Sequence, residues 1–401
     1  MNSTTLRFIR EHLTDDVHTL ALQVRRYPDV DMPAALTQIA GRQAAAQKLP
    51  LWHACEDLRY PPHLPLEQCS SEATARYKAR ILPKADSLVD LTGGFGVDCA
   101  FLSECVKRTV YVERNEELCR TAAHNFPLLG CRHIKVVNSD AIVYLEQMPP
   151  VDCIYLDPAR RNGQGSKVIA VADCEPDVAR LQPLLLQKAR HVLIKLSPML
   201  DLTQALSVMT QTEQVHIVAV GNECKELLLL LGHSPMPTEE VPIHCVNLPH
   251  TSVTASDLPQ SFTFTRRQES NDVCRYAATP RTYLYEPNAA LLKAGAFRSI
   301  ACRYDLEKLA VNTHLYTSDR LITDFPGRCF HITGSCAANK KELKALLGEI
   351  DQANLTVRNF PASVAELRRK LRLAEGGYIY LFATTLRDGQ KILIAGEKFV
   401  N

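Results

Sequence analysis

The chain has 401 residues, of which 46% are hydrophobic and 22% charged, and its 46 basic and 44 acidic residues give a net charge of +2. This composition can fill more than one core, which excludes a disordered chain. The charge balance excludes a basic surface over the whole chain, although not a local basic face. The longest leucine run, residues 227–231, is far shorter than the ~20 apolar residues of a membrane-spanning helix.

The N-terminus has no apolar signal-peptide core, because Arg7, Arg10 and Glu11 interrupt it. We therefore expect a cytoplasmic protein without membrane contact. The 14 cysteines lie between Cys55 and Cys336 without a C-x-x-C pair, and the histidines show no ligand spacing. We expect reduced thiols and no metal site.

Residues 1–75 are predicted to form a helical N-terminal domain, and Ser70 or Ser71 can cap a helix that runs to Arg80. From residue 76 to about 270, short apolar strands alternate with helices. This pattern is typical of a doubly wound α/β domain whose parallel sheet is covered on both faces. The expected strands are residues 88–91, 109–112, 134–137, 153–156, 191–196, 215–220 and 226–231.

The remaining chain is predicted to be α+β. A small domain at 281–324 holds a helix at 288–297 and further elements at 304–312 and 314–317. Residues 325–401 follow with strand 329–332, helix 339–350, strand 355–358, helix 363–373 and strands 378–385 and 391–395. Asp388-Gly389 lies between the last two strands and is a strong hairpin signal.

A glycine-rich loop, Asp90-Leu-Thr-Gly-Gly-Phe-Gly96, follows the first strand of the α/β domain and precedes a helix. Glycines let the backbone turn tightly and approach a ligand, which can bind to the free amides of the helix. A nicotinamide fingerprint would need glycine at position 99, where the chain has Cys99. From this loop alone, two alternatives stay open: a turn with a purely structural role and a site for another nucleotide.

Polar residues also follow the next three strands. Glu113 ends the second strand, where an acid can accept hydrogen bonds from ribose hydroxyls. Asp140 follows the third strand and can contact adenine or cap the next helix. Asp157 and Pro158 follow the fourth strand. Ligands of open α/β sheets bind at this carboxyl edge, so the four signals converge there.

Together these motifs resemble a class I S-adenosylmethionine (SAM) methyltransferase, which implies SAM as cofactor. Thr92 stands where the family usually has the first glycine of the loop. The resemblance implies that the loop flanks the methionine part of SAM, that Glu113 holds the ribose and Asp140 the adenine, and that Asp157 faces the substrate. The implied cofactor-binding residues are Asp90, Thr92, Gly93, Gly94, Gly96, Glu113, Asp140, Ala141 and Asp157, and the implied catalytic residues are Asp157, Pro158 and Arg160.

Nearly the whole chain resembles a narrower family, in which a helical extension precedes the methyltransferase and a small ferredoxin-like segment and a THUMP-like domain follow it. The matching stretches include Glu67-Gln-Cys-Ser-Ser-Glu, Ala75-Arg-Tyr-Lys-Ala, Leu156-Asp-Pro-Ala-Arg-Arg, Ile194-Lys-Leu-Ser-Pro-Met, Tyr285-Glu-Pro-Asn and Phe325-Pro-Gly-Arg. THUMP domains occur in RNA-modifying enzymes, so the resemblance implies an RNA substrate, tRNA or rRNA.

The sequence leaves open which atom of the substrate is methylated. Enzymes that methylate exocyclic amines usually have a second proline and an aromatic ring where this chain has Ala159 and Arg160. The chain is closer to 5-methyluridine enzymes at this point, but it has Ser197 near the position of their nucleophilic cysteine. Covalent addition by that route is therefore not expected. Asp157 is expected to orient the acceptor or take its proton, or else only to order its loop.

The leading hypothesis is an RNA methyltransferase. The alternatives are a methyltransferase of a protein or small molecule and a non-catalytic protein that binds RNA or SAM. The basic loop at 160–167 can be a phosphate-contacting lid or a solvated loop, and the strip at 368–372 can grip RNA or be a solvated helix face. Gln68 and Ser70 precede the sheet closely enough to close over SAM.

Overall fold

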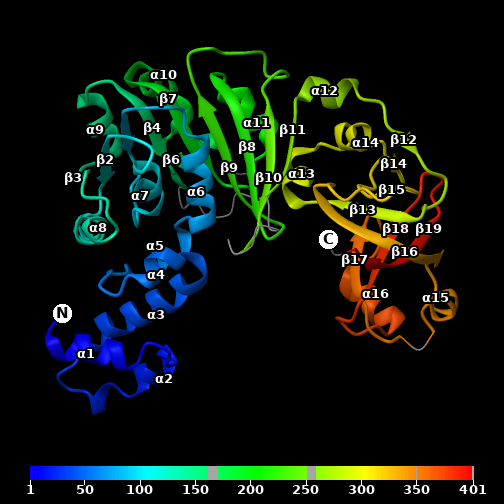
Figure 1. Ribbon diagram of the computed structural model, residues 1–401, viewed down its shortest axis with the longest axis horizontal. Helices are drawn as coiled ribbons and strands as arrows, with labels where there is room; N and C mark the ends of the chain where they lie inside the picture. Colours follow the sequence, from blue (N-terminus) through cyan, green and yellow to red (C-terminus); the bar gives the residue numbers. More distant parts are fainter. Residues whose placement is uncertain (161–169, 251–258, 349, 400–401) are drawn as a thin grey trace. The chain divides into compact units, whose positions relative to one another are not determined.

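The computed structural model describes residues 1–160, 170–250, 259–348 and 350–399, and within them the side chains of all residues except His63 and Arg160. The chain divides into two compact units. The first contains Met1–Val215 and Glu226–Met236, and the second contains His216–Lys225, Pro237–Leu248 and the described residues from 259 onward. Each unit is described by itself (Figure 1).

The N-terminal part of the first unit is helical, as predicted. Polar side chains start several of its helices: Asn2, Asp16, Asp31 and Ser71 each accept a hydrogen bond from a backbone amide in the first turn. Phe8, Leu20 and Ile39 belong to a small core between the first helices. The helices are α1 (Ser3–Glu11), α2 (Val17–Leu22), η1 (Val24–Arg26), α3 (Met32–Lys48), α4 (Pro50–Ala54), α5 (His63–Gln68) and α6 (Glu72–Ile81).

The predicted strands all form, in a mixed sheet. The strands are β1 (Ser87–Asp90), β2 (Arg108–Glu113), β3 (Ile134–Asn138), β4 (Val151–Leu156), β7 (Ala189–Leu196), β8 (Thr212–Val220), β9 (Glu223–Leu231), β10 (Ile243–Leu248) and β11 (Gln260–Phe264). Their order is β3-β2-β1-β4-β7-β9-β8-β10-β11. The sheet thus has nine strands rather than about seven, because β10 and β11 come from the segment after β9.

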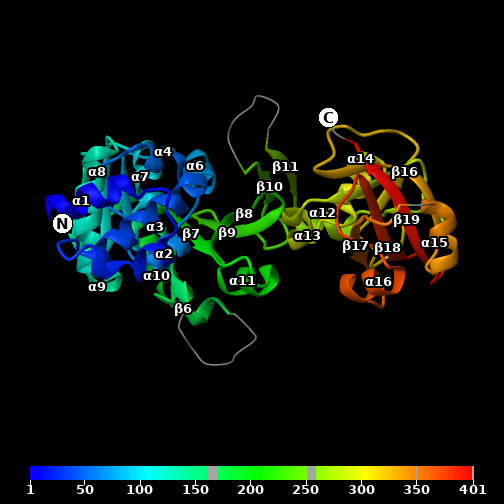
Figure 2. The same ribbon diagram turned by 90° about the horizontal axis from the view of Figure 1, so that it is seen from below.

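The strands β3, β2, β1, β4 and β7 run parallel to one another, whereas β9 is antiparallel to β7. Consequently the start of β9 lies at the carboxyl edge of its parallel neighbours. Helices cover the sheet on both faces, as predicted, with α7 (Val97–Ser103) and α8 (Glu116–Leu128) on one face and α9 (Ala141–Gln147) and α10 (Val178–Lys188) on the other (Figure 2). Ile154, Val192 and Leu229 are fully buried between these layers.

Three further elements belong to this part of the chain. The helix α11 (Leu202–Val208) connects β7 to β8. The short strands β5 (Ala159–Arg160) and β6 (Cys174–Glu175) pair with each other beyond β4, and η2 (Val171–Asp173) precedes β6.

The second unit contains a sheet of eight strands in the order β12-β14-β15-β13-β16-β19-β18-β17. The boundary predicted at residues 324 and 325 lies between β15 and β16, and strands from both sides of it share this sheet. The strands are β12 (Arg275–Tyr276), β13 (Tyr283–Pro287), β14 (Glu307–Lys308), β15 (Tyr316–Ser318), β16 (Gly327–Ala337), β17 (Asn354–Arg358), β18 (Ile379–Thr385) and β19 (Lys391–Lys398), and the helices are α12 (Arg266–Asn271), α13 (Ala289–Ala294), α14 (Ser299–Tyr304), α15 (Lys340–Leu347) and α16 (Val364–Leu371).

This second sheet is buried on two sides, which follows from the alternation of side chains along a strand. On β18, Leu381 belongs to the core under α15 and α16, while its neighbour Phe382 belongs to a different core. On β19, Leu393 and Ile394 divide in the same way. The α15 and α16 helices therefore have one apolar face on the sheet and a polar face in solvent.

Within the part of the chain that the structure describes, no helix is long and apolar enough to cross a membrane. The same residues contain no group of three or more His, Cys, Asp or Glu side chains that could hold a metal ion. The structure describes all 14 cysteines, none of which forms a disulfide, and Cys99, Cys153 and Cys245 are buried. They behave as small apolar side chains.

Candidate active site

The glycine-rich loop leaves β1 and begins α7 at the carboxyl edge of the sheet. Asp90 is buried, and its Oδ1 accepts a hydrogen bond from the Thr92 amide at 3.0 Å. The Thr92 hydroxyl in turn accepts a hydrogen bond from the Asp157 amide at 2.6 Å. Thr92 thereby ties the loop after β1 to the end of β4. The residue that replaces the usual glycine has a structural role of its own.

The three glycines of the loop are required for different reasons. A Cβ on Gly93 would lie 2.2 Å from the Tyr111 ring, and one on Gly96 would lie 2.9 Å from Phe126. These two glycines are needed for internal packing, and Gly96 also has a φ of +87°. Gly94 has a φ of +55°, but a Cβ there would meet no described atom closer than 3.8 Å, the Thr92 carbonyl oxygen. The loop is therefore open beside Gly94.

Glu113, at the end of β2, holds the loop from the neighbouring strand. Its two carboxylate oxygens accept hydrogen bonds from the Gly94 amide at 2.9 Å and the Asn115 amide at 2.8 Å. Each carboxylate oxygen has a second lone pair, so the group can still accept a bond from a ligand. The ribose contact that the sequence predicts for Glu113 stays a prediction.

Asp140 caps α9, the helix that starts at Ala141. Its Oδ1 accepts hydrogen bonds from the Ile142 amide at 2.8 Å and the Val143 amide at 3.2 Å. The sequence allowed capping of the next helix as one of two roles for Asp140, and this cap is present. The other oxygen, Oδ2, has no hydrogen-bond partner among the residues described, so capping leaves it available for an adenine amino group.

Asp157 follows β4 and forms an ion pair with Lys195, which lies on the adjacent strand β7. Lys195 Nζ contacts Oδ2, whereas Oδ1 has no hydrogen-bond partner in the described part of the chain. The following residue, Pro158, is buried and restricts the backbone of Asp157 to extended conformations. One carboxylate oxygen is therefore held in place and the other is available.

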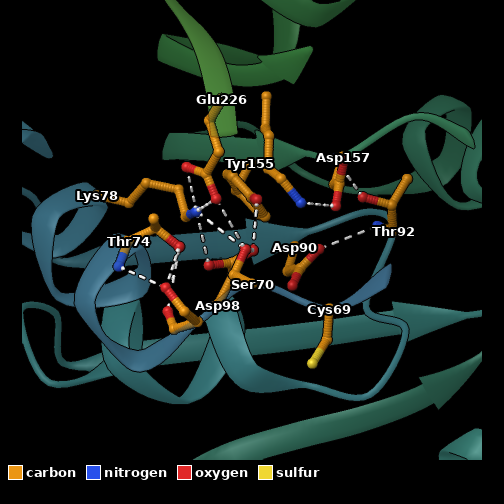
Figure 3. A network of polar contacts seen from close by, with 12 residues as sticks. Cys69, Ser70, Thr74, Lys78, Asp90, Thr92, Asp98, Tyr155, Asp157 and Glu226 are labelled. Atoms are coloured by element: carbon orange, nitrogen blue, oxygen red, sulfur yellow. Dashed lines mark hydrogen bonds and ion pairs between the residues drawn. The ribbon is translucent and has the colours of Figure 1, made fainter. Parts of the chain in front are cut away.

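A buried polar network adjoins this pair, as Figure 3 shows. Lys78 on α6 is fully buried, and its ammonium group lies 2.7 Å from Glu226 Oε1 and 3.1 Å from Asp98 Oδ1. Ser70 and Tyr155 complete the network, with their hydroxyl oxygens 2.7 Å from Asp98 Oδ2. The network joins the N-terminal helices to α7, β4 and the start of β9.

The charges of these groups determine their protonation. Burial alone would raise the pKa of Asp98, but Lys78 and Lys195 and two hydroxyl donors outweigh it, so that the pKa of Asp98 is lowered. Burial would lower the pKa of Lys195, but Asp157, Glu226 and Asp98 reverse this and raise it. The pKa of Asp157 is raised by burial despite Lys195.

Asp90 differs from Asp98 and Asp157 because no cation is paired with it among the described residues. Burial raises its pKa well above the ordinary value, and the charges of Asp98, Asp157 and Glu113 raise it further. A cationic ligand at this edge would favour the ionised form of Asp90. The carboxyl edge of the sheet is thus arranged to receive positive charge.

The sequence predicts that both Gln68 and Ser70 lie close enough to the sheet to close over SAM. Ser70 is buried in the polar network, whereas Gln68 is exposed at the end of α5. The side chain of Arg160 and the residues up to Lys167 lie outside the described residues. The sequence analysis missed Lys78, Asp98 and Glu226, although Lys78 belongs to the quoted stretch Ala75-Arg-Tyr-Lys-Ala.

The comparisons with known proteins agree with this geometry. A family model described as a ferredoxin-like domain matches residues 283–326, and one described as THUMP domain-like matches residues 327–398. One similar protein is a methyltransferase, named as such by proposal, whose crystal structure is from Porphyromonas gingivalis W83. Its sequence is 36% identical to this chain, and the two structures match with a TM-score of 0.86 over 99% of this chain and 98% of that one. An uncharacterized S-adenosylmethionine-dependent methyltransferase from Mycobacterium tuberculosis (strain H37Rv) is 25% identical over 319 residues, covering 77% of this chain and 79% of the relative.

The fold and the loop after β1 define a class I methyltransferase. More specifically, the chain belongs to the SAM-dependent methyltransferases that carry a C-terminal THUMP-like domain. SAM is the methyl donor of this enzyme class. The open space at Gly94, beside the carboxylate of Glu113, fits such a ligand.

Proposed function

We propose that this enzyme transfers the methyl group of SAM to a nucleotide of an RNA molecule, tRNA or rRNA. The observation that carries the RNA part of the proposal is the charge on the two helices of the segment that matches the THUMP domain-like model. Lys340, Lys341 and Lys344 on α15 are exposed, as are Arg369 and Lys370 on α16. Clustered basic side chains of this kind neutralise phosphates.

The acidic residues of the same helices offset only part of this charge. Glu342 accepts a hydrogen bond from the Ala337 amide at 2.8 Å, and Glu366 accepts one from the Ser363 amide at 2.7 Å. Both carboxylates are thus engaged at the helix N-termini, while the lysines and arginines extend into solvent. Arg368 is different, because its guanidinium donates to the Ala353 and Ala374 carbonyl oxygens and supports the fold.

We further propose that Glu113 and the loop from Asp90 to Gly96 hold SAM, with Asp140 and Ala141 beside the adenine. Bound SAM supplies an activated methyl group on a sulfonium. In-line positioning contributes most to such a transfer, because the leaving group departs neutral. The available Oδ1 of Asp157 can accept a hydrogen bond or a proton from the attacking group, while Lys195 fixes the carboxylate and Pro158 the backbone.

A transfer assay tests the substrate class. The full chain is incubated with SAM carrying an isotope-labelled methyl group and, separately, with RNA, protein and small-molecule fractions from cells that lack the enzyme. We expect label in the RNA fraction, and mass spectrometry of its nucleosides then identifies the methylated atom. Label only in the protein or small-molecule fraction would contradict the proposal, as would no transfer at all.

The salt dependence of RNA binding tests the basic helices. Replacing Lys344, Arg369 and Lys370 with glutamine should reduce the slope of log affinity against log salt by about 2–3, because each phosphate contact contributes about 0.7–0.9. The matched control replaces three exposed arginines of the first unit and so changes the net charge equally: Arg25, Arg26 and Arg80. Equal slopes for the two triple variants would remove α15 and α16 from the RNA site.

A further inference from the structure

A pocket of about 520 Å³ is formed entirely by residues of the second unit. Its walls come from α12, the connection between α13 and α14, and the chain from Lys308 to His314. This volume lies in the range of pockets that bind small molecules and cofactors. None of its lining residues takes part in the proposed methyl transfer.

The charge of the pocket is positive. Three cationic side chains line it, Arg266, Arg298 and Lys308, against the single carboxylate of Glu269. That carboxylate is already engaged, because it accepts hydrogen bonds from three consecutive amides, residues 297–299, at 2.8–3.1 Å. Among the residues described, neither Arg298 nor Lys308 forms an ion pair. The pocket therefore has an excess of positive charge.

Lys308 is the most informative of these cations. Its side chain is only 2% exposed, and its ammonium group donates to the Val311 carbonyl oxygen at 2.9 Å. The rings of Phe297 and Tyr316 lie 5.5 and 5.9 Å away. A buried ammonium without an ion pair is costly, and burial lowers its pKa although Cys274 and Glu269 partly oppose this shift. An anion in the pocket would supply the missing counter-charge.

Aromatic rings stand beside these cations. Phe297 and His314 are stacked, with ring centroids 3.6 Å apart and planes inclined by 14°. Burial lowers the pKa of His314 to about 4, so the ring is neutral at physiological pH. Its Nδ1 is buried without a hydrogen-bond partner in the described chain, although a polar atom in such a position normally has one. The pocket thus offers two kinds of contact. Its cations can bind an anionic group, and its aromatic rings and the polar nitrogen can bind a planar group.

We infer that this pocket binds a phosphorylated nucleoside, with the phosphate beside Lys308 and Arg298 and the base near Phe297 and His314. The ligand has two sources with the same chemistry, a free nucleotide and the phosphorylated end of an RNA chain. The inference does not rest on the proposed RNA methylation, because a free nucleotide would bind whatever the methyl acceptor is.

Titration calorimetry with the full chain tests the inference, using two matched pairs of ligands. One pair is AMP and adenosine, and the other is a short RNA with a 5′-phosphate and the same RNA with a 5′-hydroxyl. We expect the phosphorylated member of at least one pair to bind about ten- to a hundredfold more tightly, the effect of hydrogen bonds between charged groups. A preference in the AMP pair identifies a free nucleotide as ligand, and a preference in the RNA pair alone identifies a chain end.

Three variants locate the site. Lys308→Met and Arg298→Gln should each remove most of the phosphate preference, whereas Arg320→Gln makes the same charge change at an exposed residue outside the pocket and should retain it. Arg298 is exposed, so its replacement leaves the core intact even if Lys308→Met disturbs folding. Equal binding within both ligand pairs would overturn the inference. An Arg298→Gln protein that keeps the full phosphate preference would also overturn it.

Discussion

Replacing Lys78 with methionine should strongly destabilise the first unit. Methionine has a similar length but no charge, so the replacement leaves Asp98 and Glu226 buried without the ammonium group that separates them. Removing one partner from a buried ion pair costs about 3–5 kcal/mol, because the remaining charge is desolvated without compensation. We expect a loss of stability in this range near neutral pH.

The only tryptophan of the chain makes the measurement local. Trp52 is buried in the first unit, with its ring centroid 4.7 Å from that of Phe95. Its fluorescence during urea unfolding therefore reports the unit that contains Lys78. Lys107→Met is the matched control, since Lys107 pairs with Asp86 at 3.0 Å while both side chains are largely exposed. Such surface pairs contribute little, so this control should unfold close to the wild type.

The pH dependence distinguishes an electrostatic effect from a packing defect. In the wild type the pKa of Asp98 is lowered, so its contribution to stability is present at neutral pH and is lost as the pH falls through that pKa. In Lys78→Met the buried carboxylates take up protons more readily, so the variant should recover stability relative to the wild type between about pH 7 and pH 5. A loss below about 1 kcal/mol, or a difference that does not change with pH, would refute this reasoning.

Three replacements at the carboxyl edge give further predictions, each measured by calorimetry with SAM or by methyl transfer to RNA. Gly94→Val should abolish SAM binding, whereas Gly130→Val, at a positive φ of +80° outside the site, should leave it intact; equal binding would contradict the role of the loop. Glu113→Ala should weaken SAM binding by roughly 1.5–3 kcal/mol, and an unchanged affinity would remove it from the site. Asp157→Ala should keep SAM affinity within a few-fold and reduce turnover by about 10²–10⁴, while Asp157→Asn should match alanine only if the carboxylate takes a proton. An alanine variant that loses SAM binding would instead make Asp157 a cofactor residue.

Most of the fold could be predicted because its signals are local. Each strand from Leu88 to Leu231 is a short apolar run between polar turns, and the hairpin at Asp388-Gly389 joins the last two strands as expected. The antiparallel direction of β9 has no local signal, because a buried apolar strand such as Leu227–Leu231 has the same composition in either direction. The nine-stranded sheet was missed for a different reason, since β10 and β11 lie within a segment, residues 234–268, in which prolines and serines interrupt the apolar pattern.

That the proposed cofactor-binding residues share one edge of the sheet could be predicted, because a motif after a strand lies at the same edge as the motifs after its parallel neighbours. The buried network could not, because its members are far apart in the chain: Lys78 contacts Glu226 across 148 residues. No periodicity connects a lysine on a polar helix with the acid that precedes the leucine run of a distant strand. Glu226 reaches the site only because β9 runs antiparallel to β7.

This reversal of direction links the fold to the electrostatics of the site. Because β9 begins where β7 ends, Glu226 lies at the edge that also carries Asp98 and Asp157, and the two lysines there, Lys78 and Lys195, face an excess of carboxyl groups. Asp90 begins the glycine-rich loop at this edge and has no paired cation among the described residues, and burial and neighbouring charges raise its pKa. SAM carries a sulfonium and an ammonium group, so binding it would relieve the repulsion that the folded chain maintains at this edge. The same carboxylates that repel one another at this edge would thus favour a cationic donor over a neutral or anionic nucleotide.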